Sequence, residues 1–188
     1  MAWEQQKELK KIPLPNPNDI LLMAQNEENI RDRALFIISY LTGGRVSEIL
    51  SLRRKNFIYR EIDMGERVRK IILVKDLINE KNRQKHFKDI PIPIDKEFEA
   101  VLWNLLYDYT SSLGLDELLF NISKRRAHTI LTQKFGLNPH FLRHIRASHL
   151  IIYYDFNETM LTRFMGWTDS RPAKFYISLK WEDMLQKI

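Results

Sequence analysis

The longest apolar stretch of the chain ends just before two glycines, and this arrangement restricts how the chain can fold. The stretch is Ala34–Leu41 (ALFIISYL), and Gly43 and Gly44 follow it closely. Apolar residues recur at helical spacing from Ile30 onward, which predicts a helix over 30–41 that the glycines end. The run is too short to span a bilayer, and the N-terminal MAWEQQKELKK lacks the apolar region of a secretory signal. We therefore expect a soluble intracellular protein.

The rest of the apolar pattern predicts a mainly α-helical domain with one small three-stranded antiparallel sheet, an α+β fold. Further helices are expected from Ile20, over 98–109, before Gly136, over 140–153 and over 158–165. The candidate caps are Asp19 for the helix from Ile20, Asp95 for 98–109, Ser123 for the helix before Gly136 and Asn157 for 158–165. The expected strands are 57–62, 67–74 and 89–94, and the prolines of the last strand (DIPIPI) place it at a sheet edge. The segment of roughly 76–88 between the last two strands is polar and basic, which favours a projecting hairpin or loop.

The first residues differ in character from the rest of the chain. Pro13, Pro15 and Pro17 alternate through IPLPNPND and do not suit a regular helix. Residues 1–19 are therefore expected to form an arm or linker, and residues 20–188 a single domain.

The charge of the chain is positive and unevenly distributed. Lysine and arginine number 30 against 24 aspartates and glutamates, which gives a net charge of +6 and a pI near 9.5. Basic residues gather in 67–88 and in 121–150, and the second segment contains no carboxylate. Two such blocks favour a phosphate-binding face, although any one of these cations can equally be ordinary solvated surface. The candidates are Arg67, Arg69, Lys70, Arg83, Lys85, Lys124, Arg125 and Arg126.

Several classes of site are excluded by composition. The chain has no cysteine, so it has no disulfide, thiolate zinc site or cysteine nucleophile. His140 and His144 have the spacing of a metal-binding pair on a helix, but no acid accompanies them and the neighbouring charges are positive. We therefore expect no metal and no other cofactor.

Two short motifs place arginines where they could contact phosphate. In TGGRVSEIL, Arg45 and Glu48 lie on one helical face, either as a structural ion pair or as an arginine held ready to bind an anion. In PHFLRHIRASHL, His140 and Arg143 are three residues apart, so one helical face presents both.

The motifs together are more informative than each alone. TGGRxxE, a basic hairpin lysine, HxxR, GW and a tyrosine nine residues after that tryptophan follow one another in the order seen in the tyrosine recombinases. The chain resembles the catalytic domain of this phage integrase-type family from about Pro15 to Leu179. The resemblance implies a catalytic set of Arg45, Lys81, His140, Arg143, Trp167 and Tyr176, supported by Glu48 and His144. Lys85 is the alternative to Lys81 as the hairpin lysine.

The chain departs from the family pattern at three points. Trp167 stands where histidine is usual, a substitution that some members share, and Ala173 stands where threonine is common. The N-terminal core-binding domain that usually helps to clamp DNA has no counterpart in residues 1–19. The chain is therefore expected to be a fragment, an isolated catalytic domain or a minimal member.

The resemblance implies a site-specific recombinase or integrase that cleaves and rejoins double-stranded DNA without metal, through a 3′-phosphotyrosine. Type IB topoisomerase-like relaxation and an inactive DNA-binding module are the alternatives. It also implies a cytoplasmic, DNA-associated protein that works as a homo-tetramer on DNA. The C-terminal segment 179–188, anchored by Trp181, Met184 and Leu185, either exchanges between subunits or folds back on its own core.

Overall fold

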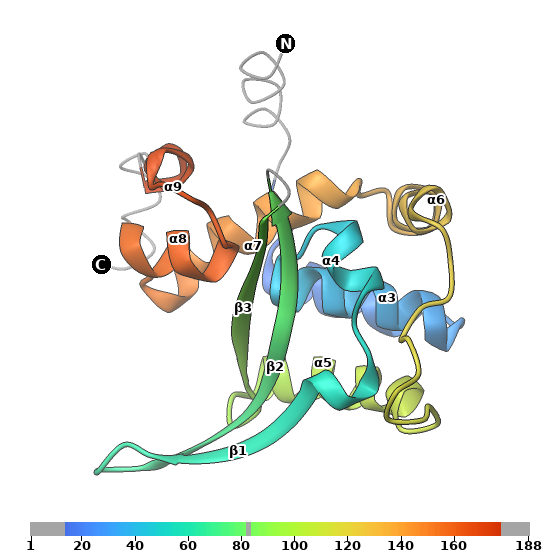
Figure 1. Ribbon diagram of the computed structural model, residues 1–188, viewed down its shortest axis with the longest axis horizontal. Helices are drawn as coiled ribbons and strands as arrows, with labels where there is room; N and C mark the ends of the chain where they lie inside the picture. Colours follow the sequence, from blue (N-terminus) through green and yellow to red (C-terminus); the bar gives the residue numbers. More distant parts are fainter. Residues whose placement is uncertain (1–13, 82–83, 178–188) are drawn as a thin grey trace.

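The computed structural model describes residues 14–81 and 84–177, which fold as a group of helices with a three-stranded sheet packed against one side of it (Figure 1). The helices are α2 (Pro17–Asn26), α3 (Ile30–Thr42), α4 (Val46–Leu50), α5 (Glu97–Thr110), α6 (Lys124–Phe135), α7 (Pro139–Tyr154), α8 (Glu158–Met165) and α9 (Arg171–Ile177), with a 3-10 turn, η1 (Arg54–Asn56). The strands β1 (Phe57–Asp63), β2 (Val68–Lys81) and β3 (Gln84–Pro93) pair antiparallel in the order β1-β2-β3. The predicted fold class is confirmed. The segment 179–188 and most of the expected arm lie outside the described residues.

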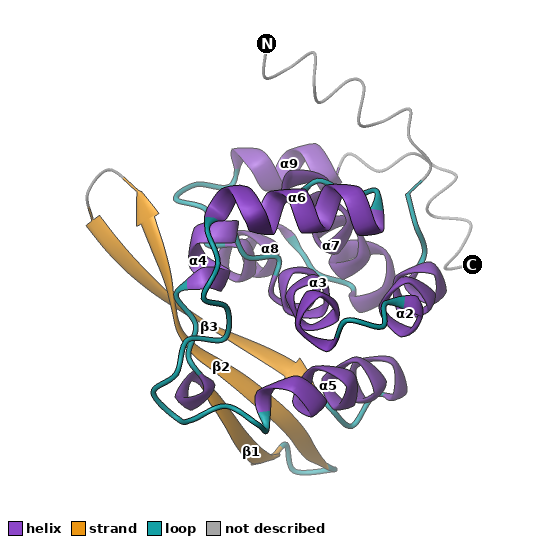
Figure 2. Cartoon of the chain, turned by 90° about the vertical axis from the view of Figure 1, so that its right-hand side faces the viewer, coloured by secondary structure: helices purple, strands orange, loops and turns teal. Residues whose placement is uncertain are grey.

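Helix α3 is the centre of the fold, as its apolar run predicts. It packs against α2, α4, α5, α6 and α7, and Figure 2 shows it enclosed by the other helices. Every residue from Ala34 to Thr42 is buried, so the helix is covered on all sides rather than on one face. Ile30, which was expected on the core face, is 47% exposed. At the other end, Gly43 adopts a left-handed φ of 55° and ends the helix.

Helix caps decide where the helices begin, and two of the four expected caps are confirmed. Ser123 accepts a hydrogen bond from the Arg126 amide (3.1 Å), and Asn157 accepts one from the Met160 amide (2.9 Å). Asp95 is not a cap, because Lys96 precedes α5 and Asp95 pairs with Arg69 instead.

The start of α2 also differs from the prediction. The helix begins at Pro17 rather than Ile20, and its cap is Asn16, whose side chain accepts the Asp19 amide at 3.1 Å. Asp19 completes a capping box by accepting the Asn16 amide at 2.8 Å. Pro17 fits the first helical position because the amide that it lacks needs no partner there.

The sheet is longer than the sequence pattern predicts. Of the hairpin or loop expected over 76–88, the structure has the hairpin, because β2 and β3 remain paired as far as Lys81 and Gln84. A bulge between Val74 and Leu77 shifts the alternation of apolar and polar residues along β2, so this alternation does not predict that the strand continues. β3 is an edge strand, as its prolines predict.

Helix α7 holds a buried arginine that the sequence analysis did not single out. Arg146 is 1% exposed, and its guanidinium carbon lies 5.1 Å from the ring centroid of Tyr40 and 5.3 Å from that of Tyr154. Its Nη1 lies 3.9 Å from Glu99 of α5, and the Tyr154 hydroxyl donates a hydrogen bond to the same carboxylate. Burial of the arginine therefore depends on one carboxylate and on aromatic faces.

A second polar contact ties the start of the described chain to the same helix. His149 is 1% exposed, and its Nε2 donates to the Pro15 carbonyl at 2.8 Å. Its Nδ1 must then accept the hydroxyl of Tyr40, also at 2.8 Å. Burial lowers the pKa of His149 to about 4, so the ring is neutral at pH 7 and suits both bonds.

The Arg146–Glu99 pair gives a stability prediction. Glu99→Ala leaves the buried guanidinium of Arg146 without its carboxylate, and we expect it to lower the free energy of unfolding by about 3–5 kcal/mol. Urea denaturation followed by circular dichroism measures this change. Glu97→Ala, at an exposed position of the same helix, is the control and should cost less than about 1 kcal/mol. Equal losses for the two variants would contradict the role given to Glu99.

Candidate active site

Arg143 joins three of the sequence motifs through its guanidinium. It lies on the second turn of α7, is 8% exposed, and uses two nitrogens to bind carbonyls at the ends of α3 and α8. Nη1 donates to Gly43, two residues before Arg45, and Nη2 donates to Met165 at 2.5 Å, two residues before Trp167. The TGGR loop, the HxxR helix and the GW loop are thereby brought to one place.

The close approach of these loops requires the first glycine of the TGGR motif. Gly43 has a left-handed φ of 55°, and a Cβ atom built there would lie 3.1 Å from the sulfur of Met165. A larger residue is therefore disfavoured by both its backbone and its surroundings. The carbonyl that Arg143 binds is set by this turn.

Arg45 is oriented by the acid that the sequence pairs with it. Its Nη1 lies 2.8 Å from Glu48 Oε1, and its backbone amide donates to Glu48 Oε2 at 3.0 Å. The Glu48 side chain is 1% exposed, whereas that of Arg45 is 37% exposed. A buried carboxylate therefore holds a guanidinium that still reaches the surface, which fits both interpretations offered by the sequence.

Lys88 joins this cluster and was missed in the sequence analysis. Its ammonium lies 3.3 Å from Glu48 Oε2, and its side chain is 8% exposed. Burial lowers its pKa to about 8; Arg143 and Arg45 act in the same direction, and Glu48 opposes them. The sequence did contain a signal for its burial. Lys88 is two residues before Ile90 and four before Ile92, both buried, so the three lie on the same apolar face of β3.

Tyr176 lies beside Trp167 and His144. Its ring stacks on that of Trp167 with centroids 5.7 Å apart and planes at 17°, and it lies 5.0 Å from the His144 ring. Arg143 lies 5.8 Å from the Trp167 ring. Burial raises the pKa of Tyr176 and Arg143 opposes this rise, so the phenol is protonated at neutral pH.

For the remaining predicted catalytic residues, the described part of the structure gives the element on which each lies but no contact with Arg143 or Tyr176. His140 is exposed on the first turn of α7, one turn before Arg143. Lys81 is the last residue of β2 and Lys85 the second of β3, while Arg83 lies outside the described residues. The catalytic roles of these residues stay predictions.

A cleft of about 680 Å³ lies between the sheet and the end of α8. Lys75, Phe87 and Lys88 line it from the strands, and Arg163 and Trp167 line it from the other side. Cations beside aromatic rings are typical of surfaces that contact nucleic-acid backbones and bases.

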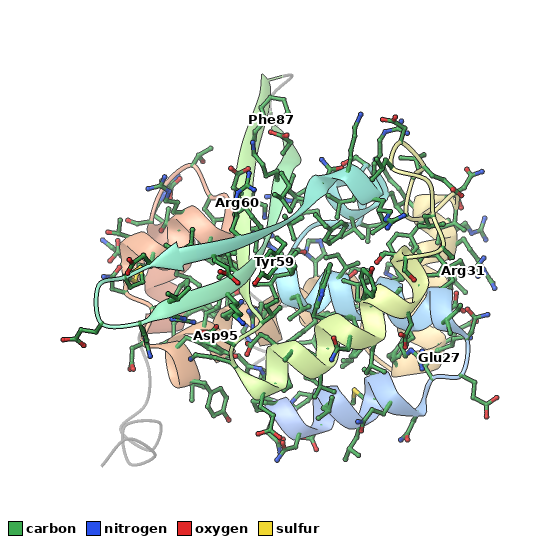
Figure 3. The ribbon with its side chains drawn as sticks, turned by 90° about the horizontal axis from the view of Figure 1, so that it is seen from below. Glu27, Arg31, Tyr59, Arg60, Phe87 and Asp95 are labelled. Carbon is green, nitrogen blue, oxygen red and sulfur yellow. The ribbon has the colours of Figure 1, made fainter. Side chains whose placement is uncertain are left out.

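The predicted phosphate-binding residues fall into two separate groups. Lys124, Arg125 and Arg126 are exposed at the start of α6, at the opposite end of the molecule from the β1–β2 turn (Figure 1). Arg67 and Lys70 are exposed at that turn, but Arg69 is held by Asp95. Figure 3 shows Asp95 well away from Phe87 of the cleft. Among the described residues that line the cleft, none belongs to either group, so their roles as DNA contacts stay predictions.

In residues 14–81 and 84–177, no group of three or more histidines, aspartates or glutamates could hold a metal ion. Among the helices described, none is both long and apolar enough to cross a membrane.

Comparison with known proteins establishes the class. The model of the phage integrase family matches residues 16–182, so the chain belongs to that family. The crystal structure of XerA recombinase superposes with a TM-score of 0.57 at 18% identity, covering 91% of this chain and 61% of that one. The Tn1549 transposon integrase in complex with circular intermediate DNA gives a TM-score of 0.58 at 16% identity, with coverages of 94% and 66%.

A third structure, XerH site-specific recombinase bound to its difH substrate, gives a TM-score of 0.51 at 17% identity, covering 96% of this chain and 50% of that one. The fold is thus that of the tyrosine recombinases, and the chain is a tyrosine recombinase by family. It spans about half to three-fifths of the XerH and XerA chains that it matches. Comparison with the curated proteins gave no match.

The contact between Tyr176 and His144 can be tested by titration. Burial lowers the pKa of His144, and the Tyr176 ring is part of its cover. Tyr176→Ala should therefore raise the pKa of His144 towards the ordinary histidine value of about 6.5. NMR of ring-labelled histidine measures this shift. Tyr107→Ala, at an exposed position on α5, is the control and should leave the His144 curve unchanged. An unchanged His144 curve in Tyr176→Ala would contradict the contact.

Proposed function

We propose that this chain is the catalytic domain of a site-specific DNA recombinase or integrase that cleaves and rejoins double-stranded DNA through a 3′-phosphotyrosine. The observation that carries the proposal is the bridge made by Arg143 between the loops that precede Arg45 and Trp167. Because Trp167 stacks on Tyr176, two arginines and the phenol belong to one assembly. The family match and the DNA complexes of XerH and Tn1549 integrase support the same class.

The two arginines neutralise the scissile phosphate. A phosphodiester is anionic, so charge that develops during attack must be stabilised by preorganised donors. Arg45 and Arg143 donate N–H groups to the non-bridging oxygens, and loss of one such donor costs about 2.7–4 kcal/mol in other enzymes. The indole N–H of Trp167 adds a further donor but cannot carry a proton between groups.

Tyr176 is the nucleophile. Its oxygen bonds to phosphorus as the bond from phosphorus to the 5′-oxygen breaks, which leaves a 3′-phosphotyrosine and a free 5′-hydroxyl. The phenol proton passes to His140 or His144, and Lys81 gives a proton to the departing 5′-oxygen. The ester retains the bond energy, so the 5′-hydroxyl of another strand reverses the step without ATP.

The register of the hairpin supports Lys81 rather than Lys85. Leu77 is opposite Lys88 in the ladder, and Lys81 is opposite Gln84. Because sides alternate along a strand, position 81 falls on the same side of the sheet as Lys88, which lies in the site. Position 85, an odd number of residues from Lys88, falls on the other side.

Double-stranded DNA is the proposed partner, and the active form is a homo-tetramer assembled on it. The exposed cations at the start of α6 and at the β1–β2 turn supply phosphate contacts to the DNA backbone. The protein is expected to be cytoplasmic and DNA-associated, encoded by a virus, by another mobile element or by a host chromosome.

Two other functions share part of this geometry. A type IB topoisomerase-like enzyme uses the same phosphotyrosine chemistry, and it would relax supercoiled DNA without joining strands to a new partner. A DNA-binding module without catalysis is disfavoured, because the arginines, the tryptophan and the tyrosine are all present and in contact or linked through Arg143. Strand transfer to a second duplex separates recombinase from topoisomerase.

A covalent trap tests the nucleophile. Nicked duplexes of randomised sequence lose the short 5′-hydroxyl strand after cleavage, so we expect the protein to remain attached to DNA through Tyr176. Tyr176→Phe should form no adduct, because it lacks the attacking oxygen. Denaturing gels and peptide mass spectrometry detect the product. Tyr107→Phe, at an exposed position on α5, is the matched control and should retain it. An adduct with Tyr176→Phe would show that another residue attacks.

Leaving-group chemistry tests the general acid. Lys81→Ala should slow cleavage of ordinary DNA by about 10²–10⁴-fold, because the departing oxygen then lacks its proton. A 5′-phosphorothiolate needs no such proton, so the same variant should cleave it at close to the normal rate. Lys85→Ala is the matched control and should not show this difference. Rescue of Lys85→Ala alone would transfer the role to Lys85, and rescue of neither would refute both assignments.

A further inference from the structure

The histidine that follows Arg143 along α7 is in contact with the tyrosine of the site. The rings of His144 and Tyr176 have their centroids 5.0 Å apart and their planes at 41°. On Tyr176 the indole of Trp167 also stacks, at 5.7 Å. The indole nitrogen is a donor only, whereas a neutral imidazole has one nitrogen that accepts. Of the two rings that touch the phenol, only the imidazole can therefore take its proton.

The ring nitrogens of His144 are not used to hold the fold together. Within the described part of the chain, no hydrogen bond or ion pair engages either nitrogen, and none engages the hydroxyl of Tyr176. By contrast, both nitrogens of His149 on the same helix are occupied, by the Pro15 carbonyl and the Tyr40 hydroxyl. Covered histidines with a purely structural role normally have such partners. An acceptor and a donor without partners thus lie side by side in the site.

We propose that His144 is the general base of the cleavage step and takes the phenol proton of Tyr176. This proposal rests on the function proposed above, and it decides between the two histidines named there. As the bond from the phenol oxygen to phosphorus forms, the phenol proton moves to the unprotonated ring nitrogen of His144. The bond from phosphorus to the 5′-oxygen breaks, and Lys81 supplies the proton for that oxygen. When the step reverses, the imidazolium of His144 returns its proton to the phenol oxygen.

The placement of His140 does not suit it to this role. His140 is exposed on the first turn of α7, and no ring contact or hydrogen bond joins it to Tyr176 among the described residues. Side chains four residues apart share a helical face, so His144 lies on the same face one turn further along, where α9 covers it. A base must come within about 2.6–3.2 Å of the oxygen that it deprotonates. Rotation of two rings already in contact achieves this for His144 alone.

The surroundings of His144 keep it in the form that a base requires. Its ring stacks on that of Phe141 at 5.9 Å, and the Phe175 ring lies 6.2 Å away. This burial lowers the pKa of His144 below its ordinary value, so the imidazole is largely neutral at pH 7. The protonated form cannot accept a second proton, and activity should therefore be lost only as the pH falls through that lowered pKa.

A more acidic phenol at position 176 tests the base directly. Rates of adduct formation are measured with a nicked duplex selected from the randomised pool. With ordinary tyrosine, His144→Asn should slow adduct formation by about 10²–10⁴-fold relative to the parent protein. With 3,5-difluorotyrosine in place of Tyr176 in both proteins, the ratio should fall to about 10-fold or less, because the fluorinated phenol needs less help to lose its proton. An unchanged ratio overturns the inference.

His140→Asn is the matched control, because it removes a histidine from the same face of the same helix. Any loss that it causes with ordinary tyrosine should persist with difluorotyrosine. Recovery in His140→Asn but not in His144→Asn would assign the base to His140 and overturn the inference. Failure of the parent protein to form any adduct overturns the proposed function and this inference together, whereas an adduct whose His144→Asn ratio is the same with both phenols overturns the inference alone.

The unsubstituted protein gives a second measurement that does not depend on the folding of a variant. At sub-saturating DNA, adduct formation should fall as the pH falls through the pKa of His144 in the free protein, which lies below about 6.5. The titratable groups around this ring are Tyr176 from α9, and Arg143 and His140 from its own helix. NMR of ring-labelled histidine gives the pKa of His144, and the midpoint of the rate profile should equal it. A midpoint that departs from this pKa overturns the inference.

Discussion

The guanidinium of Arg143, held between the carbonyls of Gly43 and Met165, is the contact on which the arrangement of the site depends. These two carbonyls are dipoles without net charge, so they satisfy donors while leaving the positive charge of the arginine uncompensated. Arg146, one turn later on α7, is the opposite case, since a carboxylate and aromatic faces surround it. Helix α7 thus carries two buried arginines. Arg146 is paired within the core, whereas the charge of Arg143 is not neutralised by a carboxylate and can attract an anion. Burial lowers the pKa of Arg143 only to about 10, so it remains charged at neutral pH.

The other charges of the site also leave it with an excess of positive charge. Arg45, Lys88 and Arg143 surround the single buried carboxylate of Glu48, which leaves an excess of positive charge where the chain is largely closed to water. Burying such an excess costs free energy in the unoccupied protein, and an incoming phosphate offsets that cost. In the proposed function, this charge favours binding of phosphate over a neutral ligand.

The sequence predicted the parts of this site that depend on local spacing. The glycines that end α3, the caps of α6 and α8 and the pairing of Arg45 with Glu48 all lie within a few residues of their partners. Contacts between distant segments were not predictable in this way. Arg69 binds Asp95 from across the sheet, and Lys88 reaches Glu48 only because the strands continue past the bulge at Val74 and Leu77. Roles for His140 and the hairpin lysines still rest on the family resemblance, because their spacing alone does not bring them to Tyr176.

The protonation state of Tyr176 limits how the proposed reaction can proceed. Burial keeps the phenol of Tyr176 protonated at neutral pH, and bound phosphate would weaken the stabilising field of Arg143 further. Loss of the phenol proton must therefore accompany attack rather than precede it, which requires a base close to the ring. His144 lies 5.0 Å from that ring, and the same burial lowers its pKa, so it is largely neutral at pH 7 and able to accept a proton. The apolar setting that makes the nucleophile weak thus also maintains a base beside it, and the two effects have one cause.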